Sequence, residues 1–320
     1  GDIAISTANN EVVGRPTVAV GPTAASPVYF VWRATDAGAD PNTTLGRIQV
    51  RLMRQDLCPW NSGDASTLIL QPSEATENAA SPSIAVRSDG LEAVVAWYSV
   101  GVLGGDAARI RSRPLGVAVD NVGQLEANGC NGELTPCTHS DRTRGGVPSI
   151  TAFQDGYALV WPEPRNDGTT GYVASLAILD ANAAVVASGV STRPFGDVYT
   201  LELATAANTS EVLLAQAGYP LPMTPAPEDD DVFIERFDVT ASSLGPAVRV
   251  NGQTDGRQVR PGIAALPGGA AIVAWQSATP DGDTEVYGRV LDADDEPMFT
   301  GFACDETDFR LSATAGTYRI

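Results

Sequence analysis

The sequence of 320 residues contains no lysine and a single histidine, His139. All 20 basic residues are therefore arginine, and against 39 acidic residues they leave a formal net charge of −19. Such an acidic surface repels the phosphates of nucleic acids, so neither DNA nor RNA is an expected partner. With only one histidine, a catalytic triad of serine, histidine and aspartate is not expected either.

Long hydrophobic runs are also missing. No stretch reaches the roughly 18 consecutive apolar residues that a membrane-spanning helix needs, so no membrane span is predicted. The Gly-x-Ser-x-Gly motif of hydrolases is absent, as are the phosphate-binding, dinucleotide-binding and kinase motifs. Glycine and proline, in contrast, are abundant at 32 and 22 residues, and only 18% of the chain is charged. This composition is typical of many short strands joined by turns.

One pattern recurs along the chain: a proline-led apolar segment, a tight turn, and a second strand that ends in tryptophan. The first three prolines follow one another at the same interval of 66 residues (82 − 16 and 148 − 82). The prolines are Pro16, Pro82, Pro148 and Pro261, and the tryptophans are Trp32, Trp97, Trp161 and Trp275. Turns such as Asp89-Gly90 and Gly268-Gly269 join the two strands, as in antiparallel hairpins. A repeat of this length, built from short strands, predicts a β-propeller.

We expect an all-β propeller of five blades, each an antiparallel sheet of four strands, in one domain spanning residues 1–320. The blades are expected near residues 15–70, 80–125, 146–190, 197–250 and 260–313. The fourth lacks the proline and carries Gln216 in place of tryptophan. The fourth strand of the second blade is expected near Val117–Val122. We expect the tryptophans to pack between blades.

Residues 1–14 hold a surplus strand, Ile3-Ala-Ile5, for which five blades offer no place. An unpaired strand edge seeks a partner. We expect this strand either to join the last blade near Phe309–Leu311 or to pair with a second copy of the chain. The second alternative predicts self-association.

Four cysteines predict two disulfide bonds. Cys130 and Cys137 enclose a short polar loop, whereas Cys58 and Cys304 follow the third strands of the first and last blades and are expected to hold the ring closed. Four cysteines allow three pairings, among which the sequence does not choose. A zinc site is the weaker alternative, because there is one histidine and no Cys-x-x-Cys pair. An even cysteine count in an acidic chain indicates an oxidising, extracellular or cell-surface setting.

The loops between the second and third strands are acidic and predict a calcium site, because calcium binds six to eight oxygen ligands. The leading candidates are Asp281, Asp283 and Glu285 in the last blade. Weaker ones in the loops of other blades are Asp36, Asp40 and Asp167. None matches the twelve-residue calcium loop, and aspartate and glycine are ordinary turn residues, so solvated turns are the alternative.

The loops that lead into the next blade carry arginines, including Arg193, Arg257 and Arg260. In propellers these loops share one face with the acidic loops, among them the one that begins at Glu163. The arginines are therefore expected either to form ion pairs between blades or to line a pit that binds carboxylates or sugars.

The segment Arg260–Trp275, continued by Asp281–Asp292, resembles the degenerate propeller repeats of large secreted bacterial surface proteins. The resemblance implies an extracellular, propeller-like domain and supplies no catalytic residue. We therefore predict a secreted or cell-surface propeller that acts as a binding or structural interaction domain for a glycan or a protein.

Two alternatives remain open. The first is a carbohydrate-active hydrolase that uses acidic residues of the central pit, since a glycosidase needs only two carboxylates. With 39 acidic residues, however, some pair at that spacing is expected by chance. The Asp-box of sialidase-type propellers, Ser-x-Asp-x-Gly-x-Thr-Trp, is absent. The second alternative is a subunit of an extracellular filament or surface layer.

Overall fold

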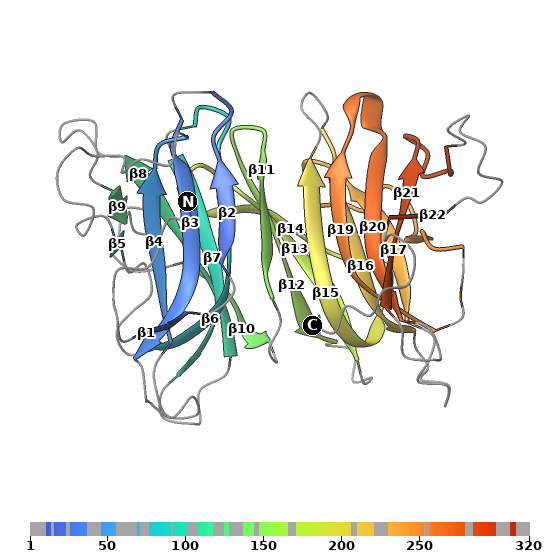
Figure 1. The fold of residues 1–320 in the computed structure, drawn as a ribbon, viewed down its shortest axis with the longest axis horizontal. Helices are drawn as coiled ribbons and strands as arrows, with labels where there is room; N and C mark the ends of the chain where they lie inside the picture. Colours follow the sequence, from blue (N-terminus) through green and yellow to red (C-terminus); the bar gives the residue numbers. More distant parts are fainter. Residues whose placement is uncertain are drawn as a thin grey trace. The chain divides into compact units, whose positions relative to one another are not determined.

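The structure is a computed structural model. It describes residues 11–13, 16–23, 26–36, 46–55, 69–70, 77–90, 92–101, 108–117, 125–127, 137–143, 147–165, 171–205, 210–220, 230–252, 254, 256–278, 284–298 and 308–311. Within these ranges nearly all regular structure is β-strand, as the composition predicts (Figure 1). No helix in this part of the chain is long and apolar enough to cross a membrane.

The described strands form four hydrogen-bonded sheets with antiparallel neighbours. We number the four-stranded groups along the chain as blades 1 to 5; blades 3 and 4 belong to one sheet, because Tyr172 pairs with Phe195. Blade 1 contains β2 (Thr17–Val20), β3 (Val28–Asp36), β4 (Arg47–Met53) and β5 (Ile69–Leu70). Blade 2 contains β6 (Glu77–Val86), β7 (Glu92–Gly101), β8 (Ala108–Val117) and β9 (Leu125–Ala127). Two further strands join these sheets: β1 (Glu11–Val13) pairs with β3, and β10 (Cys137–Thr143) pairs with β8.

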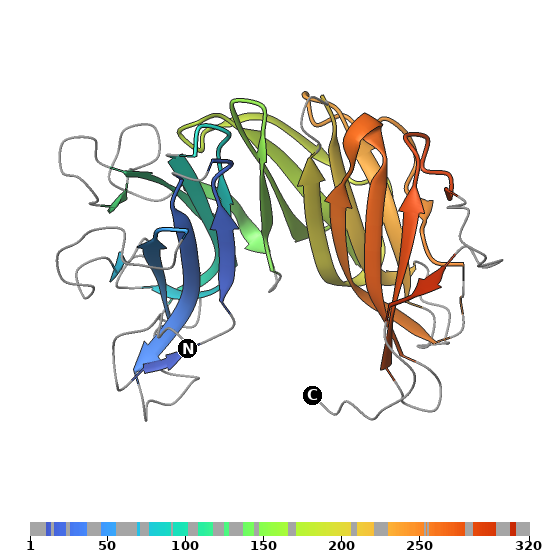
Figure 2. The same ribbon diagram turned by 45° about the horizontal axis from the view of Figure 1, so that its top comes forward.

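The later blades follow the same order. Blade 3 contains β11 (Ser149–Phe153), β12 (Gly156–Pro164), β13 (Tyr172–Leu179) and β14 (Val185–Val190). Blade 4 contains β15 (Phe195–Thr205), β16 (Val212–Pro220), β17 (Asp231–Phe237) and β18 (Val248–Arg249). Blade 5 contains β19 (Arg257–Ala265), the 3₁₀ turn η2 (Pro267–Gly269), β20 (Ala271–Ala278), β21 (Thr284–Leu291) and β22 (Phe309–Arg310). Figure 2 shows the strands of blade 5 side by side, in orange to red.

The chain divides into two compact units, Gly1–Trp161 with Ala177–Val186, and Pro162–Leu176 with Ala187–Ile320. The core of the first unit includes Trp97, with Val95 and Ile48 among its neighbours. The core of the second includes Trp275, with Val232 and Leu213 in the same cluster. Successive side chains of a strand point to opposite faces, and in β4 and β17 six consecutive residues are buried, so both faces of these strands pack in the interior. The tryptophans of the repeat are therefore core residues, as expected.

The hairpin turns follow from local chemistry. Gly90 has φ +75°, a left-handed conformation that glycine adopts without strain, and a Cβ there would collide with Ser26. After the third strands of blades 3, 4 and 5, the carboxylates of Asp180, Asp238 and Asp292 accept hydrogen bonds from backbone amides two and four residues further on. Such side chain-to-backbone bonds fix each of these turns.

Two strands of the sheet that contains blade 2 differ from expectation. The fourth strand is β9 at Leu125–Ala127, not near Val117–Val122, because β8 itself continues to Val117 and pairs there with β9. The polar segment Cys137–Thr143 forms β10, although it lacks the apolar alternation that predicts a strand. The antiparallel pairing of its backbone with β8 holds this segment in a strand, which its side chains alone do not indicate. The surplus strand at Ile3–Ile5 lies outside the described residues, so its pairing and the predicted self-association stay predictions.

Candidate functional site

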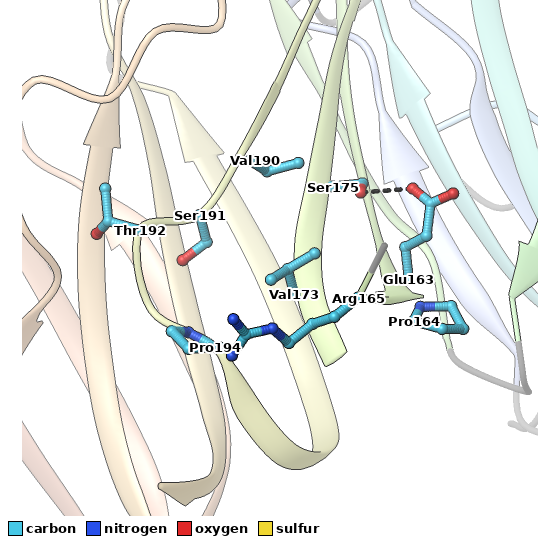
Figure 3. A pocket seen from close by; sticks show the side chains of 9 residues that line it. All are labelled: Glu163, Pro164, Arg165, Val173, Ser175, Val190, Ser191, Thr192 and Pro194. Carbon is cyan, nitrogen blue, oxygen red and sulfur yellow. Dashed lines mark hydrogen bonds between the residues drawn. The ribbon is translucent and has the colours of Figure 1, made fainter. Parts of the chain in front are cut away.

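A pocket of about 400 Å³ lies in the second unit, where blade 3 passes into blade 4. Its walls come from the end of β12, from β13, and from the connection between β14 and β15 (Figure 3). The lining residues are Glu163, Pro164, Arg165, Val173, Ser175, Val190, Ser191, Thr192 and Pro194. The end of β12 and the connection that leads into blade 4 therefore line the same pocket.

The pocket combines one charge of each sign with hydroxyl groups. Val173 and Ser175 are two residues apart on β13, so they point to the same side of the strand. The hydroxyl of Ser175 donates a hydrogen bond of 2.6 Å to the carboxylate of Glu163. In Figure 3 the guanidinium of Arg165 lies beside Pro194, on the opposite side of the pocket from this carboxylate. The backbone amide of Arg165 bonds to the carbonyl of Gly171 at 3.1 Å, which anchors the start of the loop.

A buried polar network holds the wall formed by Ser191 and Thr192. Ser191 donates its hydroxyl proton to Glu235 at 2.5 Å, and the amide of Thr192 bonds to the same carboxylate at 3.0 and 3.2 Å. Ser243 donates to Glu235 at 2.8 Å. The amide nitrogen of Gln216 donates to the Ser191 hydroxyl at 3.0 Å. Because Glu235 is only 1% exposed, these donors replace the water that a carboxylate would otherwise bind.

Blade 4 departs from the repeat at both ends of this network. Strand register places Gln216 opposite Phe233, just as Trp275 stands opposite Tyr287 in blade 5. Two residues further along the third strand, Glu235 occupies the position that is arginine in three other blades. The equivalent residues are Arg51, Arg113 and Arg289. The only blade with these two exchanges, within the described residues, is also the one that supports the pocket wall.

We expect Glu235→Gln to lower the free energy of unfolding by about 1–3 kcal/mol, because the new amide group would face donors and leave one of them unsatisfied. Urea unfolding of the variant and the parent protein measures this difference. Ser243→Ala removes one donor and keeps the carboxylate, so it should cost less. A change below about 0.5 kcal/mol in Glu235→Gln would show that the network does not depend on charge.

The calcium candidates are only partly visible. Asp281, Asp283, Asp40 and Asp167 lie outside the described residues, as does the side chain of Asp36. Glu285 is described: its carboxylate pairs with Arg310 at 2.6 Å and accepts a hydrogen bond from Tyr287 at 2.7 Å. No group of three or more potential metal ligands occurs among the residues that the structure describes. Calcium binding stays a prediction.

The cysteines are likewise largely outside the described ranges. Cys137 begins β10 and is 4% exposed. Cys58, Cys130 and Cys304 are not among the described residues, so the pairings Cys130–Cys137 and Cys58–Cys304 stay predictions.

The arginines before the first strands serve different purposes. Arg257 pairs with the buried carboxylate of Asp230 at 2.9 Å, which links blade 5 to blade 4, as the interpretation of ion pairs between blades expects. Arg260 is exposed and bonds to Gln276. Arg193 lies over the ring of Phe233, 3.5 Å from its centroid, in a cation–π contact.

The single histidine forms a close pair with a serine. His139 Nε2 lies 2.6 Å from the hydroxyl of Ser112, and its ring is 6.3 Å from that of Trp161. Burial lowers the pKa of His139 to about 4. Ser112 has no exposed surface, and none of the residues that the structure describes forms a hydrogen bond with Nδ1 of the imidazole. A nucleophile must reach its substrate and its base must be oriented by a third group, so this pair is structural rather than catalytic.

Comparison with known proteins identifies the architecture. No family model matches the sequence. No curated protein matches it either. Among solved structures, a protein of unknown function from Dyadobacter fermentans covers 97% of this chain and 88% of its own, with 12% identity and a TM-score of 0.53. The match to a Hadza microbial sialidase covers 89% of this chain and 59% of the sialidase chain, with 7% identity and a TM-score of 0.50. The match to a levansucrase variant from Bacillus subtilis covers 89% of this chain and 84% of the levansucrase chain, with 10% identity and a TM-score of 0.50.

The fold is a β-propeller. At these identities the similarity shows the fold alone. The four-stranded antiparallel blades predicted from the repeat are confirmed.

Four polar members of the site were not singled out from the sequence: Ser175, Ser191, Thr192 and Glu235. None of them belongs to a catalytic or metal-binding motif, so residue type alone gives no signal. The one available signal was Gln216 at the tryptophan position of the repeat. A polar residue at a core position needs a buried partner, and that partner marks the site.

Proposed function

We propose that this propeller binds carbohydrate and that the pocket at the passage from blade 3 to blade 4 receives a saccharide unit. The observation that carries the proposal is the lining itself. A carboxylate, a guanidinium and hydroxyl groups surround apolar patches of valine and proline in a volume of about 400 Å³. Sugars present hydroxyls that both donate and accept hydrogen bonds, and apolar faces formed by their C–H groups. A pocket of this size and mixed lining suits such a ligand.

Two further observations support the proposal. The names sialidase and levansucrase, given to two proteins of the same fold, denote enzymes that act on carbohydrates. The chain is strongly acidic and contains no lysine, which fits a binding domain that works outside the cell and on ligands other than nucleic acids. A secreted or cell-surface location is part of the proposal.

The binding test uses a glycan array followed by calorimetry on the glycans that bind. Glu163→Ala removes the carboxylate that accepts the Ser175 hydrogen bond, and it should weaken binding about 10- to 100-fold, the cost of a charge-assisted hydrogen bond. Glu296→Gln is the matched control, because this exposed glutamate belongs to the same unit but does not line the pocket. Equal affinity of Glu163→Ala and the parent protein would place the binding site elsewhere.

Hydrolysis is the second candidate function. The observation that favours it is a carboxylate in a pocket, next to a hydroxyl that holds it in place. A glycosidase needs a second carboxylate about 5–10 Å away, and none of the other lining residues carries one. Release of nitrophenol from a panel of nitrophenyl glycosides separates the two functions. Turnover that Glu163→Gln abolishes would identify an enzyme, whereas binding without turnover would identify a binding domain.

A further inference from the structure

We infer that the pocket selects uncharged saccharides and rejects acidic ones; the inference rests on the proposed carbohydrate binding. Its basis is the balance of charge around the pocket. Glu163 and Arg165 both line it, two residues apart in the chain and with opposite signs. A saccharide that carries its own charge would therefore be attracted to one of these groups and repelled by the other.

The charges behind the wall are also balanced. Glu235 lies directly behind Ser191, which donates a hydrogen bond to it at 2.5 Å. The adjacent Arg193 turns its guanidinium to the ring of Phe233 and is not among the lining residues. The buried carboxylate of Glu235 and the half-buried guanidinium of Arg193 thus both lie next to the wall formed by Ser191 and Thr192. Among these four described groups, Glu163, Arg165, Glu235 and Arg193, the two signs balance, although the whole chain carries a charge of −19.

Neutral hydroxyls fit this arrangement better than a charged group does. One hydroxyl of a sugar can donate to the Glu163 carboxylate, while another accepts from the guanidinium or the threonine hydroxyl on the opposite side of the pocket. A ligand carboxylate can only accept, so it would oppose Glu163 and would also be repelled by the net charge of the protein. Specificity then comes from the penalty on the wrong ligand as much as from attraction to the right one.

The exchange of Arg for Glu at position 235 points the same way. At the equivalent register three other blades carry an arginine. An arginine behind the Ser191 wall would make the surroundings of the pocket positive, and so receptive to acidic sugars. Blade 4 carries the opposite charge and removes that preference.

The test is an array printed with matched sets of one sugar skeleton: the neutral hexose, the uronic acid and the amino sugar. The parent protein should bind the neutral member at least about tenfold more tightly than the uronic acid, a difference of about 1.4 kcal/mol. Glu163→Gln keeps the shape and removes the negative charge of the lining, so it should gain affinity for the uronic acid. Arg165→Gln removes the positive charge of the lining and should gain affinity for the amino sugar. A purely structural role of either residue would not shift the preference in opposite directions.

The outcomes are distinct. Equal or tighter binding of uronic acids by the parent protein, weakened by Glu163→Ala, would overturn the charge selection while leaving carbohydrate binding intact. Binding of no glycan at all would overturn the proposed function as well. Salt provides an independent measurement: affinity for the neutral sugar should change little between about 0.05 M and about 0.5 M NaCl, whereas binding driven by charge would weaken strongly.

Discussion

Replacing Arg236 with methionine is expected to lower the free energy of unfolding by about 3–5 kcal/mol, because it removes the centre of a buried ion-pair network. Arg236, on β17, is 8% exposed and donates to the carboxylates of Asp295 at 2.8 Å and Glu211 at 3.1 Å. It also donates to the carbonyls of Gly269 at 2.9 Å and Asp292 at 3.0 Å. Methionine fills much of the same volume but satisfies none of these acceptors. The carboxylate of Asp295, itself only 11% exposed, would lose its cation.

Urea unfolding of the variant measures this loss. The matched control is Arg249→Met in the same blade, whose side chain is 49% exposed and lies 3.9 Å from Asp231. An exposed pair of this kind contributes at most about 1 kcal/mol, so the control should unfold close to the parent protein. If both variants lost the same amount, the network would be no more than a surface ion pair. Arg236→Lys should be intermediate, because one ammonium cannot reach four acceptors.

Acidification from pH 7 to pH 4 is expected to destabilise the fold by about 3 kcal/mol through His139 alone. Burial lowers the pKa of this imidazole to about 4, whereas an unfolded histidine has a pKa of about 6.5. Between these values the unfolded chain binds a proton that the folded protein excludes. The stability of the folded state therefore falls as the pH is lowered through this range, and below about pH 4 this contribution stops growing.

His139→Gln tests this directly, because glutamine can keep a hydrogen bond to Ser112 and does not titrate. The difference in unfolding free energy between the variant and the parent protein should therefore move by about 3 kcal/mol in favour of the variant as the pH falls from 7 to 4. Asp238 adds a separate acid sensitivity. The hydroxyl of Thr240 and the amides of Ser242 and Thr240 hold the pKa of its carboxyl below the usual value, so its contribution is lost at low pH. That loss occurs in both proteins and cancels. A pH-independent difference would mean that His139 is protonated in the folded state.

The sequence by itself determined the parts of this protein that depend on neighbours in the chain. The recurring proline-led apolar segments and the tight turns after them predict strands, and the repeated tryptophan predicts buried positions such as Trp97 and Trp275. Aspartate after the third strand, as at Asp238, marks a turn because its side chain reaches backbone amides only two to four residues away. These features were predictable because the atoms that stabilise them are close in sequence. β10 was missed because its order comes from pairing with β8, not from its own side chains.

Only the tertiary structure decided the pocket. Glu163 and Ser175 come from different strands, and Ser191 meets Glu235 across 44 positions of the sequence. Their meeting depends on strand register and on the path between β14 and β15, which no local pattern specifies. The sequence does not distinguish a serine or glutamate in a solvated loop from one in a buried network. Gln216 at a tryptophan position indicated that blade 4 is unusual, but folding alone placed it against Ser191, because a buried amide must find a partner within hydrogen-bond reach.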